Sequence, residues 1–496
     1  MDKENMLLNK LNKIHNKIST YIYSYINKNN GFKSRSFYGE TFSLNLLYKN
    51  SMLDENSKTI LLNSFENIDK KDPEFHWEFN NYAFLNYIID SNDKTVEKYL
   101  IPLTFRNVRV TNWTLLRSVS RLLAKKDENL AIEEAKDKIK TFQKDSGHIY
   151  DKKDDKSFQY HCFSMAMIAE IYEESKDEYF KNSFLKGIDF IRNFILSNGE
   201  TLYIGRGQNQ SFGYGALIYI LALAYKYTND KTILGDLEKV YTFLSKFQNE
   251  DGSFPLVMNE TKNDIPKIIN PKDTNYIGWY PYNNYFDYLP FMGYFIAKAT
   301  EVLKNLDLSD IQYKSQTSYM DDSFQKIVKP NYEAVIAKSE GYWTNDMPMP
   351  FIVYKGISIT PMYGGEQFQK SFYTLEGIAL PWCRITKTSL RKYFISSLSK
   401  NRLKIFSIFG YLKRDFNFKD DEIIITTDVY SPLFCRHNYL FKSSIIQKDE
   451  YTLEDKYFKV ISDTPLKFFT FEYCASGLLK SFRNKNKLNK LTIRLK

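Results

Sequence analysis

The chain has 496 residues, a hydrophobic content of 43% and a formal net charge of +10. This composition excludes a disordered chain, and the length favours two large folded domains over one core. No run approaches the 18 apolar residues of a membrane span, and the first thirty residues lack the continuous apolar segment of a secretory signal, so we expect a cytoplasmic protein without a transmembrane segment.

The charge and the aromatic residues bear on the kind of partner. A positive balance fits an acidic partner, either a polyanionic glycan or a nucleic acid, but a nucleic-acid role would rest on charge alone. The 38 Tyr and 38 Phe suit surfaces that pack against sugar rings, although an AT-rich genome would produce the same bias. The four cysteines are scattered without metal-site spacing, which favours free thiols in a reducing compartment.

Helical spacing of apolar residues continues from the start of the chain to about residue 305. The best examples span 6–27, 78–90, 111–124, 157–174, 179–196, 210–228, 232–248 and 284–304.

Glycine turns divide these helices into units. Three helices end on a polar turn at Gly147, Gly199 and Gly252, which are 52 and 53 residues apart, and Gly31 ends a weaker, earlier copy. A period near 50 residues with two helices per unit is typical of stacked helical hairpins. The interval from Gly31 to Gly147 leaves room for one further, degenerate unit. Five or six hairpins predict an (α/α)6 toroid, possibly incomplete, whose inner helices line a central cleft.

The pattern changes after about residue 325. Short β-rich runs bounded by Gly, Pro, Asp and Asn predict an antiparallel β-sandwich. We therefore expect an α+β protein with a toroid domain at 1–310, which holds the catalytic cleft, and a β-sandwich domain at 325–496. Seven of the last seventeen residues are Lys or Arg, so this basic tail is either a solvated end or a peripheral contact with an anionic lipid or polymer.

The stretch "YIGRGQNQSFGYGALIYILALAYKYTND", at 203–230, carries the first candidate site. Arg206, Gln208 and Gln210 precede an expected inner helix, and Tyr214 lies one turn inside it. Cationic and amide donors near a helix N-terminus suit a carboxylate or sulfate, because that end exposes free N–H groups and a partial positive charge. The alternative is a capped turn with Tyr214 in the core.

Similar residues begin the preceding inner helices. Tyr160 and His161 occupy the equivalent place one unit earlier, and Asn112 and Trp113 open the helix before that. His161 could transfer a proton near neutral pH, or it could be structural. Asn112 could neutralise a substrate carboxylate or cap its helix, and the tryptophans could stack on sugars or pack. Further candidates for substrate binding are His76, Trp77, Glu78, Asn80, Asn81, Trp279, Tyr280, Tyr282, Asn283 and Tyr285.

A helical toroid followed by an antiparallel β domain resembles polysaccharide lyases of the heparinase II/III and alginate lyase type. That resemblance implies an Asn or Gln that neutralises a uronate carboxylate, with a His and a Tyr for proton transfer. The matching candidates are Asn112, His161 and Tyr214, with Arg206 and Gln208. The "GRGQNQSFGYGAL…YTND" segment is also similar to unsaturated glucuronyl hydrolases, which depend on an Asp in the inner helices. The helix at 157–174 has Tyr160 and His161 instead, which favours the lyase.

The leading hypothesis is a carbon–oxygen lyase that cleaves an acidic, uronate-containing polysaccharide by β-elimination, without a metal or cofactor, in capsule or O-antigen metabolism. The alternatives are a uronate C5-epimerase, a non-catalytic glycan-binding or assembly protein, and a glycoside hydrolase. A hydrolase would need paired carboxylates such as Asp145, Asp155, Glu78 or Asp287. The sequence contains no P-loop, no strand–GxGxxG–helix, no HExxH, no CxxC and no GxSxG. The oligomeric state stays open.

Overall fold

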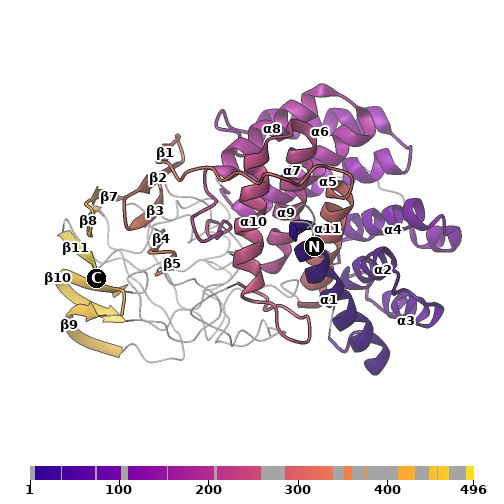
Figure 1. The fold of residues 1–496 in the computed structure, drawn as a ribbon, viewed down its shortest axis with the longest axis horizontal. Coiled ribbons are helices and arrows are strands. Elements are labelled where there is room, and N and C mark those ends of the chain that lie inside the picture. Colours follow the sequence, from indigo (N-terminus) through magenta and orange to yellow (C-terminus); the bar gives the residue numbers. More distant parts are fainter. Residues whose placement is uncertain are drawn as a thin grey trace. The chain divides into compact units, whose positions relative to one another are not determined.

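The computed structural model describes residues 6–34, 36–72, 75–101, 110–153, 155–205, 209–258, 285–338, 351–359, 375–376, 411–430, 446–454, 456–468 and 487–496. The chain forms two compact units, which are treated separately (Figure 1): a helical unit that ends at Ser315 and a β unit that starts at Gln316. No helix in the described ranges combines the length and the apolar character needed to cross a bilayer.

The helical unit contains eleven described α-helices and one 3₁₀ helix, η2. They are α1 (Met6–Asn29), α2 (Gly39–Lys49), α3 (Glu55–Glu66), α4 (Trp77–Ser91), η2 (Lys94–Tyr99), α5 (Thr111–Leu123), α6 (Glu128–Phe142), α7 (Phe158–Ser175), α8 (Glu178–Arg192), α9 (Ser211–Thr228), α10 (Lys231–Ser245) and α11 (Tyr285–Leu303).

All eight helices predicted from apolar spacing are present, and their bounds shift by up to four residues. Three others, α2, α3 and α6, are additional. Helix α2 is short and buried on nearly all sides, so it has no polar face to reveal a period. Helix α6 buries only Ala131, Ala135 and Ile139, a stripe too narrow to stand out among its charged residues.

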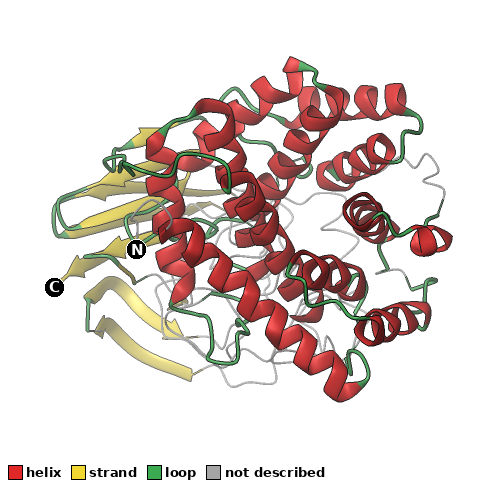
Figure 2. Ribbon diagram, turned by 45° about the vertical axis from the view of Figure 1, so that its right-hand side comes forward, coloured by secondary structure: helices red, strands yellow, loops and turns green. Residues whose placement is uncertain are grey.

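Six helices form a closed ring. Helices α2, α4, α5, α7, α9 and α11 contact one another in that order, and α11 returns to α2. Outside them, α3, η2, α6, α8 and α10 each pack on the inner helix that precedes them in the chain, and α1 packs on α11. The described helices therefore make six inner–outer pairs, the arrangement of an (α/α)6 toroid (Figure 2). Between Gly31 and Gly147 the described helices include two pairs besides α5–α6, namely α2–α3 and α4–η2, where the glycine spacing left room for one. The pair α4–η2, with a single 3₁₀ helix on its outside, is the degenerate one.

The glycine turns explain the period. Gly147, Gly199 and Gly252 have positive φ angles of 96°, 86° and 91°. A Cβ on these residues would lie 2.0–2.2 Å from a main-chain carbonyl oxygen of the next outer helix, at Lys186 in α8, Lys239 in α10 and Lys17 in α1. Only glycine allows both the left-handed conformation and this approach, so the repeat in the sequence is a repeat of one contact between neighbouring outer helices.

Phenylalanines occupy the middle of the ring. Rings from four inner helices and two from α11 lie 4.5–6.4 Å apart between successive centroids; they belong to Phe42, Phe79, Phe163, Phe212, Phe291 and Phe295. All six are buried. At this level the ring is filled rather than open, so a site for a substrate has to lie nearer to one end than the predicted central cleft implied.

The β unit contains two antiparallel sheets. The first has the order β1 (Tyr319–Met320), β2 (Phe324–Val328), β3 (Tyr332–Ala337), β4 (Phe351–Tyr354) and β5 (Ile357–Ser358). In the second, the order is β6 (Leu375–Glu376), β10 (Phe458–Phe468), β11 (Lys487–Leu495), β8 (Glu422–Tyr430) and β7 (Tyr411–Phe418), with β9 (Ile446–Glu454) also paired to β10. The prediction of antiparallel β structure is confirmed, whereas the packing of a β-sandwich stays a prediction.

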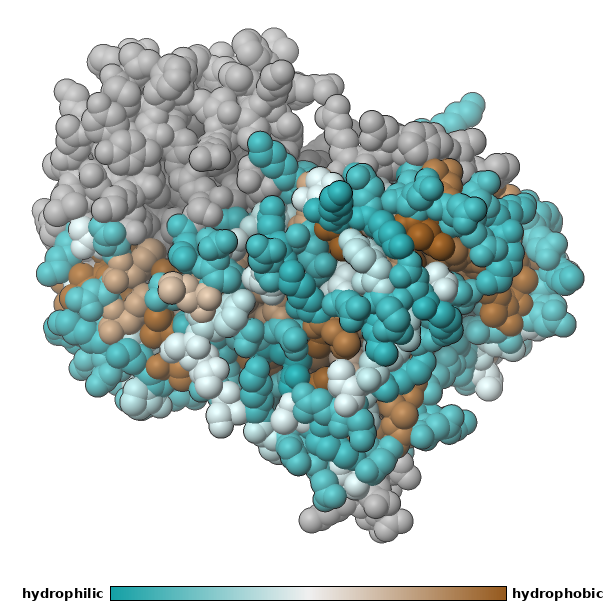
Figure 3. Space-filling view, turned by 90° about the horizontal axis from the view of Figure 1, so that it is seen from above, coloured by the Kyte–Doolittle hydropathy of each residue, from teal (hydrophilic) through white to brown (hydrophobic). Residues whose placement is uncertain are grey.

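The basic tail is partly a central strand. Residues 487–495 form β11, which pairs with β10 on one side and β8 on the other. Along it, buried Ile493 alternates with exposed Lys490 and Arg494, and Arg494 forms an ion pair with Glu422 at 2.7 Å. These residues are therefore not the free end that the charge pattern suggested. The visible face in Figure 3 is mainly hydrophilic, as expected for a lysine-rich exterior.

Candidate functional site

The six inner helices begin at the same end of the ring. For three of them, the first main-chain N–H donates to a carbonyl on the segment that leads into the next inner helix. These bonds join Thr111 N to Asp151 O (2.7 Å), Phe158 N to Ile204 O (3.1 Å) and Ser211 N to Leu256 O (3.1 Å).

The remaining helix starts are joined by side chains. Asn80, in the first turn of α4, donates to Phe37 O just before α2 at 2.8 Å. His76, which caps α4, packs against Trp113 of α5 with ring centroids 4.5 Å apart, and Asp287 joins α11 to α2. We call this the N-terminal end of the ring. Six helix N-termini gathered there favour an anionic ligand.

Asp287 is the most unusual group at the N-terminal end. Its Oδ1 accepts the main-chain N–H groups of Phe37, Tyr38 and Gly39 at 2.8–2.9 Å, and its Oδ2 has no hydrogen-bond partner among the residues that the structure describes. The pKa of this carboxyl is raised to about 8, mainly because the group is buried. The three N–H bonds lower the pKa and nearby Glu40 raises it, and both effects are smaller than that of burial. Asp287 therefore holds a proton at neutral pH, and Oδ2 is the oxygen left to carry it.

Three amide side chains lie in the first turns of neighbouring inner helices. Gln159 of α7 donates through Nε2 to Oε1 of Gln210, the cap of α9, at 3.2 Å. Within the described part of the chain, Gln159 Oε1, Gln210 Nε2 and Oδ1 of Asn112 in α5 have no hydrogen-bond partner, although all three side chains are at most 2% exposed. Buried polar atoms without partners are rare and costly, and they call for an explanation beyond folding.

Tyrosines lie beside Asp287. The hydroxyl of Tyr38, which caps α2, interacts electrostatically with those of Tyr160 and Tyr288 and with Asp287. Burial, with a smaller contribution from these groups, raises the pKa of Tyr38 well above its usual value. Tyr38 therefore keeps its proton at neutral pH. Trp113 and Trp77 are only partly buried and supply aromatic surface at the same end.

His161 and Tyr214 face outward, away from this end. Both lie at the fourth residue of an inner helix, and both accept the N–H of the residue two positions after a glycine turn. His161 Nδ1 accepts from Ile149 at 3.1 Å, and Tyr214 OH accepts from Thr201 at 3.3 Å. The other His161 nitrogen bonds Gly187 O at 3.0 Å.

Both side chains are buried, and their hydrogen-bonding groups are occupied. Tyr214 donates to Asn209 Oδ1 at 2.8 Å, and neither His161 nor Tyr214 is exposed. Burial lowers the pKa of His161 to about 3 and raises that of Tyr214 well above its usual value. The geometry therefore argues against both as catalytic groups and gives them the structural role that was the alternative in the sequence.

Other predicted residues are structural. Asn81 bonds both main-chain groups of Ile101, through Nδ2 to O at 2.8 Å and from N to Oδ1 at 3.2 Å. Tyr285 is buried and packs edge-on against Tyr21 and Phe286. Among the carboxylates considered for a hydrolase, Asp145 is fully exposed on the turn after α6 and faces Lys186 at 4.0 Å, whereas Glu78 and Asp155 are buried.

Six predicted residues lie outside the described part of the chain: Arg206, Gln208, Trp279, Tyr280, Tyr282 and Asn283. Conversely, the sequence analysis passed over Tyr38, Gln159 and Tyr288. Gln159 is the second residue of α7, and Asn112 is the second residue of α5. This shared position near the start of two inner helices was the signal in the sequence that could have identified Gln159. Within the described ranges, no three His, Cys, Asp or Glu side chains converge to hold a metal ion.

The opposite, C-terminal end of the ring holds a satisfied ionic cluster. Lys298 of α11 lies 2.5 Å from Glu170 of α7, whose carboxylate also accepts from Tyr82 OH of α4 at 2.8 Å. The ammonium group of Lys298 also lies 5.1–5.6 Å from the ring centroids of Tyr82, Tyr219 and Tyr294. The charges of Lys298 and Glu170 are matched here, as expected for groups that stabilise the ring, whereas the buried hydroxyl of Tyr294 has no hydrogen-bond partner among the described residues.

No protein-family model matches the sequence, and no curated protein sequence matches it. Among solved structures, an unsaturated glucuronyl hydrolase specific for heparin is similar at a TM-score of 0.43 and 14% identity, covering 61% of this chain and 100% of its own. A polysaccharide lyase gives 0.40 and 12%, covering 60% and 99%. A sugar epimerase from a ruminal bacterium gives 0.41 and 14%, covering 60% and 99%. The ring of helices is defined by the contacts between helices in this structure. These similarities support neither the fold nor a reaction.

Proposed function

We propose that the protein is a carbohydrate-active enzyme that cleaves a uronate-containing saccharide at the N-terminal end of the ring. The observation that carries this proposal is the set of buried polar atoms without partners on Asn112, Gln159, Gln210 and Asp287. A sugar offers many hydroxyl groups that could complete these hydrogen bonds. The six helix N-termini would favour its carboxylate, and Trp77 and Trp113 offer surfaces for a pyranose ring.

β-Elimination is the reaction we place first. A base removes the proton at C5, the electron pair forms the C4–C5 double bond, the C4–O bond breaks, and the leaving oxygen takes a proton. His76 replaces His161 as the proposed base, because it lies at the N-terminal end and an imidazole accepts protons near neutral pH. Tyr38 and Tyr160 replace Tyr214 as proton donors. Tyr38 and His76 both pack against Phe79, with ring centroids 4.6 Å and 5.9 Å away.

The uronate carboxylate must be neutralised before C5 can lose its proton. Asn112 keeps this role in the proposal, with the helix N-termini supporting it. Arg206 and Gln208 also keep their proposed roles on the basis of the sequence. No metal or cofactor is part of this scheme.

Hydrolysis is the second candidate, because Asp287 offers a protonated carboxyl. A general acid with a pKa near the working pH protonates the leaving oxygen efficiently. With its pKa raised to about 8 and Oδ2 unpartnered, Asp287 fits that requirement. In this reaction water would supply the atoms that complete the two products, and no double bond would form.

The two reactions are distinguished by the ultraviolet absorbance of the unsaturated uronate. Purified protein is incubated separately with uronate polysaccharides and with oligosaccharides that already carry an unsaturated uronate at one end. Elimination raises the absorbance of the first set, whereas a hydrolase of the glucuronyl type lowers that of the second. Protein that leaves both sets uncleaved across a broad panel would contradict the proposed function.

Tyr160→Phe and Tyr214→Phe form a matched pair for locating the site. Both remove one hydroxyl from an inner helix, but only Tyr160 lies among the groups at the N-terminal end. We expect Tyr160→Phe to reduce cleavage at least tenfold and Tyr214→Phe to retain it per folded molecule. The reverse result would return the site to the residues first predicted from the sequence.

A further inference from the structure

The contact between α2 and α11 differs from the other contacts in the ring. Every other neighbouring pair of inner helices is consecutive among the inner helices and is joined by one connection of the chain. Helices α2 and α11 are the first and the last, so only non-covalent contacts hold them together. We call this contact, together with the packing of α1 on α11, the seam.

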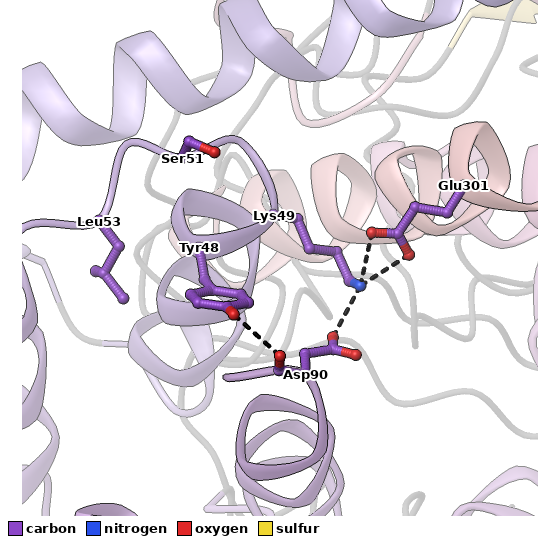
Figure 4. Close-up of a pocket in the computed structure, with 6 residues that line it drawn as sticks. All are labelled: Tyr48, Lys49, Ser51, Leu53, Asp90 and Glu301. Atoms are coloured by element: carbon purple, nitrogen blue, oxygen red, sulfur yellow. Dashed lines mark hydrogen bonds and ion pairs between the residues drawn. The ribbon is translucent and has the colours of Figure 1, made fainter. Parts of the chain in front are cut away.

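Ion pairs fasten the seam at its C-terminal end (Figure 4). Lys49, the last residue of α2, lies 2.8 Å from Glu301 of α11 and 2.8 Å from Asp90 of α4. The ammonium group is nearly buried, and although burial lowers its pKa, the two carboxylates outweigh that effect and raise it. These residues line a cavity of about 560 Å³ with Tyr48, Ser51 and Leu53, so water can reach the ion pairs when they separate.

His15 fastens the same end from α1. Its Nδ1 lies 2.8 Å from Oδ1 of Asn50, which follows α2, and its Nε2 lies 3.2 Å from Oγ1 of Thr300 in α11. One buried imidazole thus connects the first outer helix to both sides of the seam. Asn50 and Thr300 are sequence neighbours of Lys49 and Glu301, so the two sets of contacts form one cluster.

Asp287 fastens the N-terminal end of the seam. The main-chain N–H groups of residues 37–39 donate three hydrogen bonds to its carboxyl group. Separation of α2 from α11 would break these bonds. The same opening would expose a carboxyl that is otherwise fully buried.

We infer that the ring opens at this seam as a local event, separate from global unfolding, and that the Lys49–Glu301 latch sets how often it opens. Local opening occurs in contiguous units of the chain, and α2–α11 is the one neighbouring pair among the described inner helices that no direct connection of the chain holds together. Here α1 and α2 separate from α11, while the pairs from α4 to α10 stay closed. Opening at the Lys49 end is thereby coupled to exposure of Asp287 at the other. This inference does not depend on the proposed reaction.

Native-state hydrogen exchange of the full chain, followed by mass spectrometry, tests the latch. Lys49→Met removes the ammonium group and keeps the length of the side chain. Lys226→Met is the matched control, because Lys226 of α9 pairs with Glu173 of α7 at 2.6 Å, away from the seam. We expect Lys49→Met to accelerate exchange in α1, α2 and α11 roughly tenfold and to leave α7 and α9 unchanged. Lys226→Met should leave α1, α2 and α11 unchanged.

Two results would overturn the inference. One is an equal acceleration in all helices, which would mean that the seam opens only when the whole unit unfolds. The other is no change in the seam helices, which would mean that Lys49 does not hold them. If Lys49→Met fails to fold, Glu301→Gln provides the same test. The Glu301 side chain is 55% exposed, so its replacement disturbs the packing of the core less than replacement of Lys49 does.

Discussion

The two ends of the ring differ in how far their buried charged and amide groups are satisfied, although the hydroxyl of Tyr294 at the C-terminal end has no partner among the described residues. At the C-terminal end, Lys298, Glu170 and Tyr82 satisfy one another within 2.5–3.2 Å. At the N-terminal end, Asp287 and Gln210 are as deeply buried but keep atoms without partners. Because unpaired buried groups cost stability, a chain retains them where something other than folding requires them. The same six helices thus carry an end with a buried ion pair and an end at which we propose that a saccharide binds.

The largest effect is expected at the C-terminal end. Lys298→Met leaves the Glu170 carboxylate buried without its cation, which should lower the free energy of unfolding by about 3–5 kcal/mol. Denaturant unfolding measures this change, and Lys226→Met serves as the more exposed control. A loss below about 1 kcal/mol would show that this cluster does not stabilise the ring.

His161 sharpens the comparison, because it lies near the start of α7 yet faces outward. His161→Ala leaves Ile149 N and Gly187 O without partners and should destabilise the protein by about 2–4 kcal/mol. Cleavage by the fraction that stays folded should be unchanged. If cleavage is lost while the free energy of unfolding is preserved, His161 belongs to the site after all.

The pKa of His161 also predicts a dependence on acid. Burial lowers the folded-state value to about 3, below the 6.5 of the unfolded chain, so the unfolded state binds the proton more readily. The contribution of neutral His161 is therefore present above pH 6.5 and is lost as the pH falls towards 3. Stability curves of the protein and of His161→Ala should converge in that window, and parallel curves would contradict the assignment.

Asp287 predicts the opposite dependence on pH. Its folded-state pKa of about 8 lies above the ordinary 3.8, so the folded state holds a proton that the unfolded state releases. As the pH rises from 3.8 to about 8, the free energy of unfolding should fall by about 1.4 kcal/mol per pH unit. Asp287→Asn keeps an oxygen for the three N–H groups and removes the titration. Unfolding measured at pH values from 5 to 8 should show a shallower slope for the variant, and equal slopes would mean that Asp287 is ionised in the folded protein.

The smallest effect on stability is expected for the paired amides. Gln159→Met and Gln210→Met replace side chains that have unpaired atoms, so the free energy of unfolding should change by less than about 1 kcal/mol. Saccharide cleavage should nevertheless fall. Measured together, thermal unfolding and cleavage separate the two properties, and a large loss of stability with normal cleavage would reverse the comparison between the two ends.

Much of the helical unit could be predicted from the sequence. Apolar spacing located eight helices, and the intervals between Gly147, Gly199 and Gly252 gave the repeat. The interval from Gly31 to Gly147 predicted one further pair, whereas the described helices there include two, α2–α3 and α4–η2. Glycine is informative here because the contact leaves no room for a Cβ. Helix α2 was not predicted, since a helix buried on nearly all sides lacks the periodicity on which the method depends.

The candidate site was harder to predict, for a physical reason. His161 and Tyr214 do share one repeat position, as the spacing indicated, but in α7 and α9 this fourth residue points outward, towards the glycine turn. A shift of two positions along a helix turns a side chain by about half a circle, so the second residue, as in Asn112 and Gln159, marks the N-terminal end instead. The link from Asp287 to α2 joins residues 248 to 250 positions apart, and no local pattern reveals it.

The glycine contact also bears on how such a ring could arise. Gly252, in the turn after α10, meets α1 much as Gly147 meets α8 and Gly199 meets α10, so this contact between the first helix and the end of the chain's repeat is the same as the contacts within the repeat. A head-to-tail interface repeated with a constant rotation gives either an endless filament or a closed cycle. This chain is comparable to a cyclic assembly of helix pairs fused end to end, in which one glycine-mediated contact recurs at three of the junctions between neighbouring pairs.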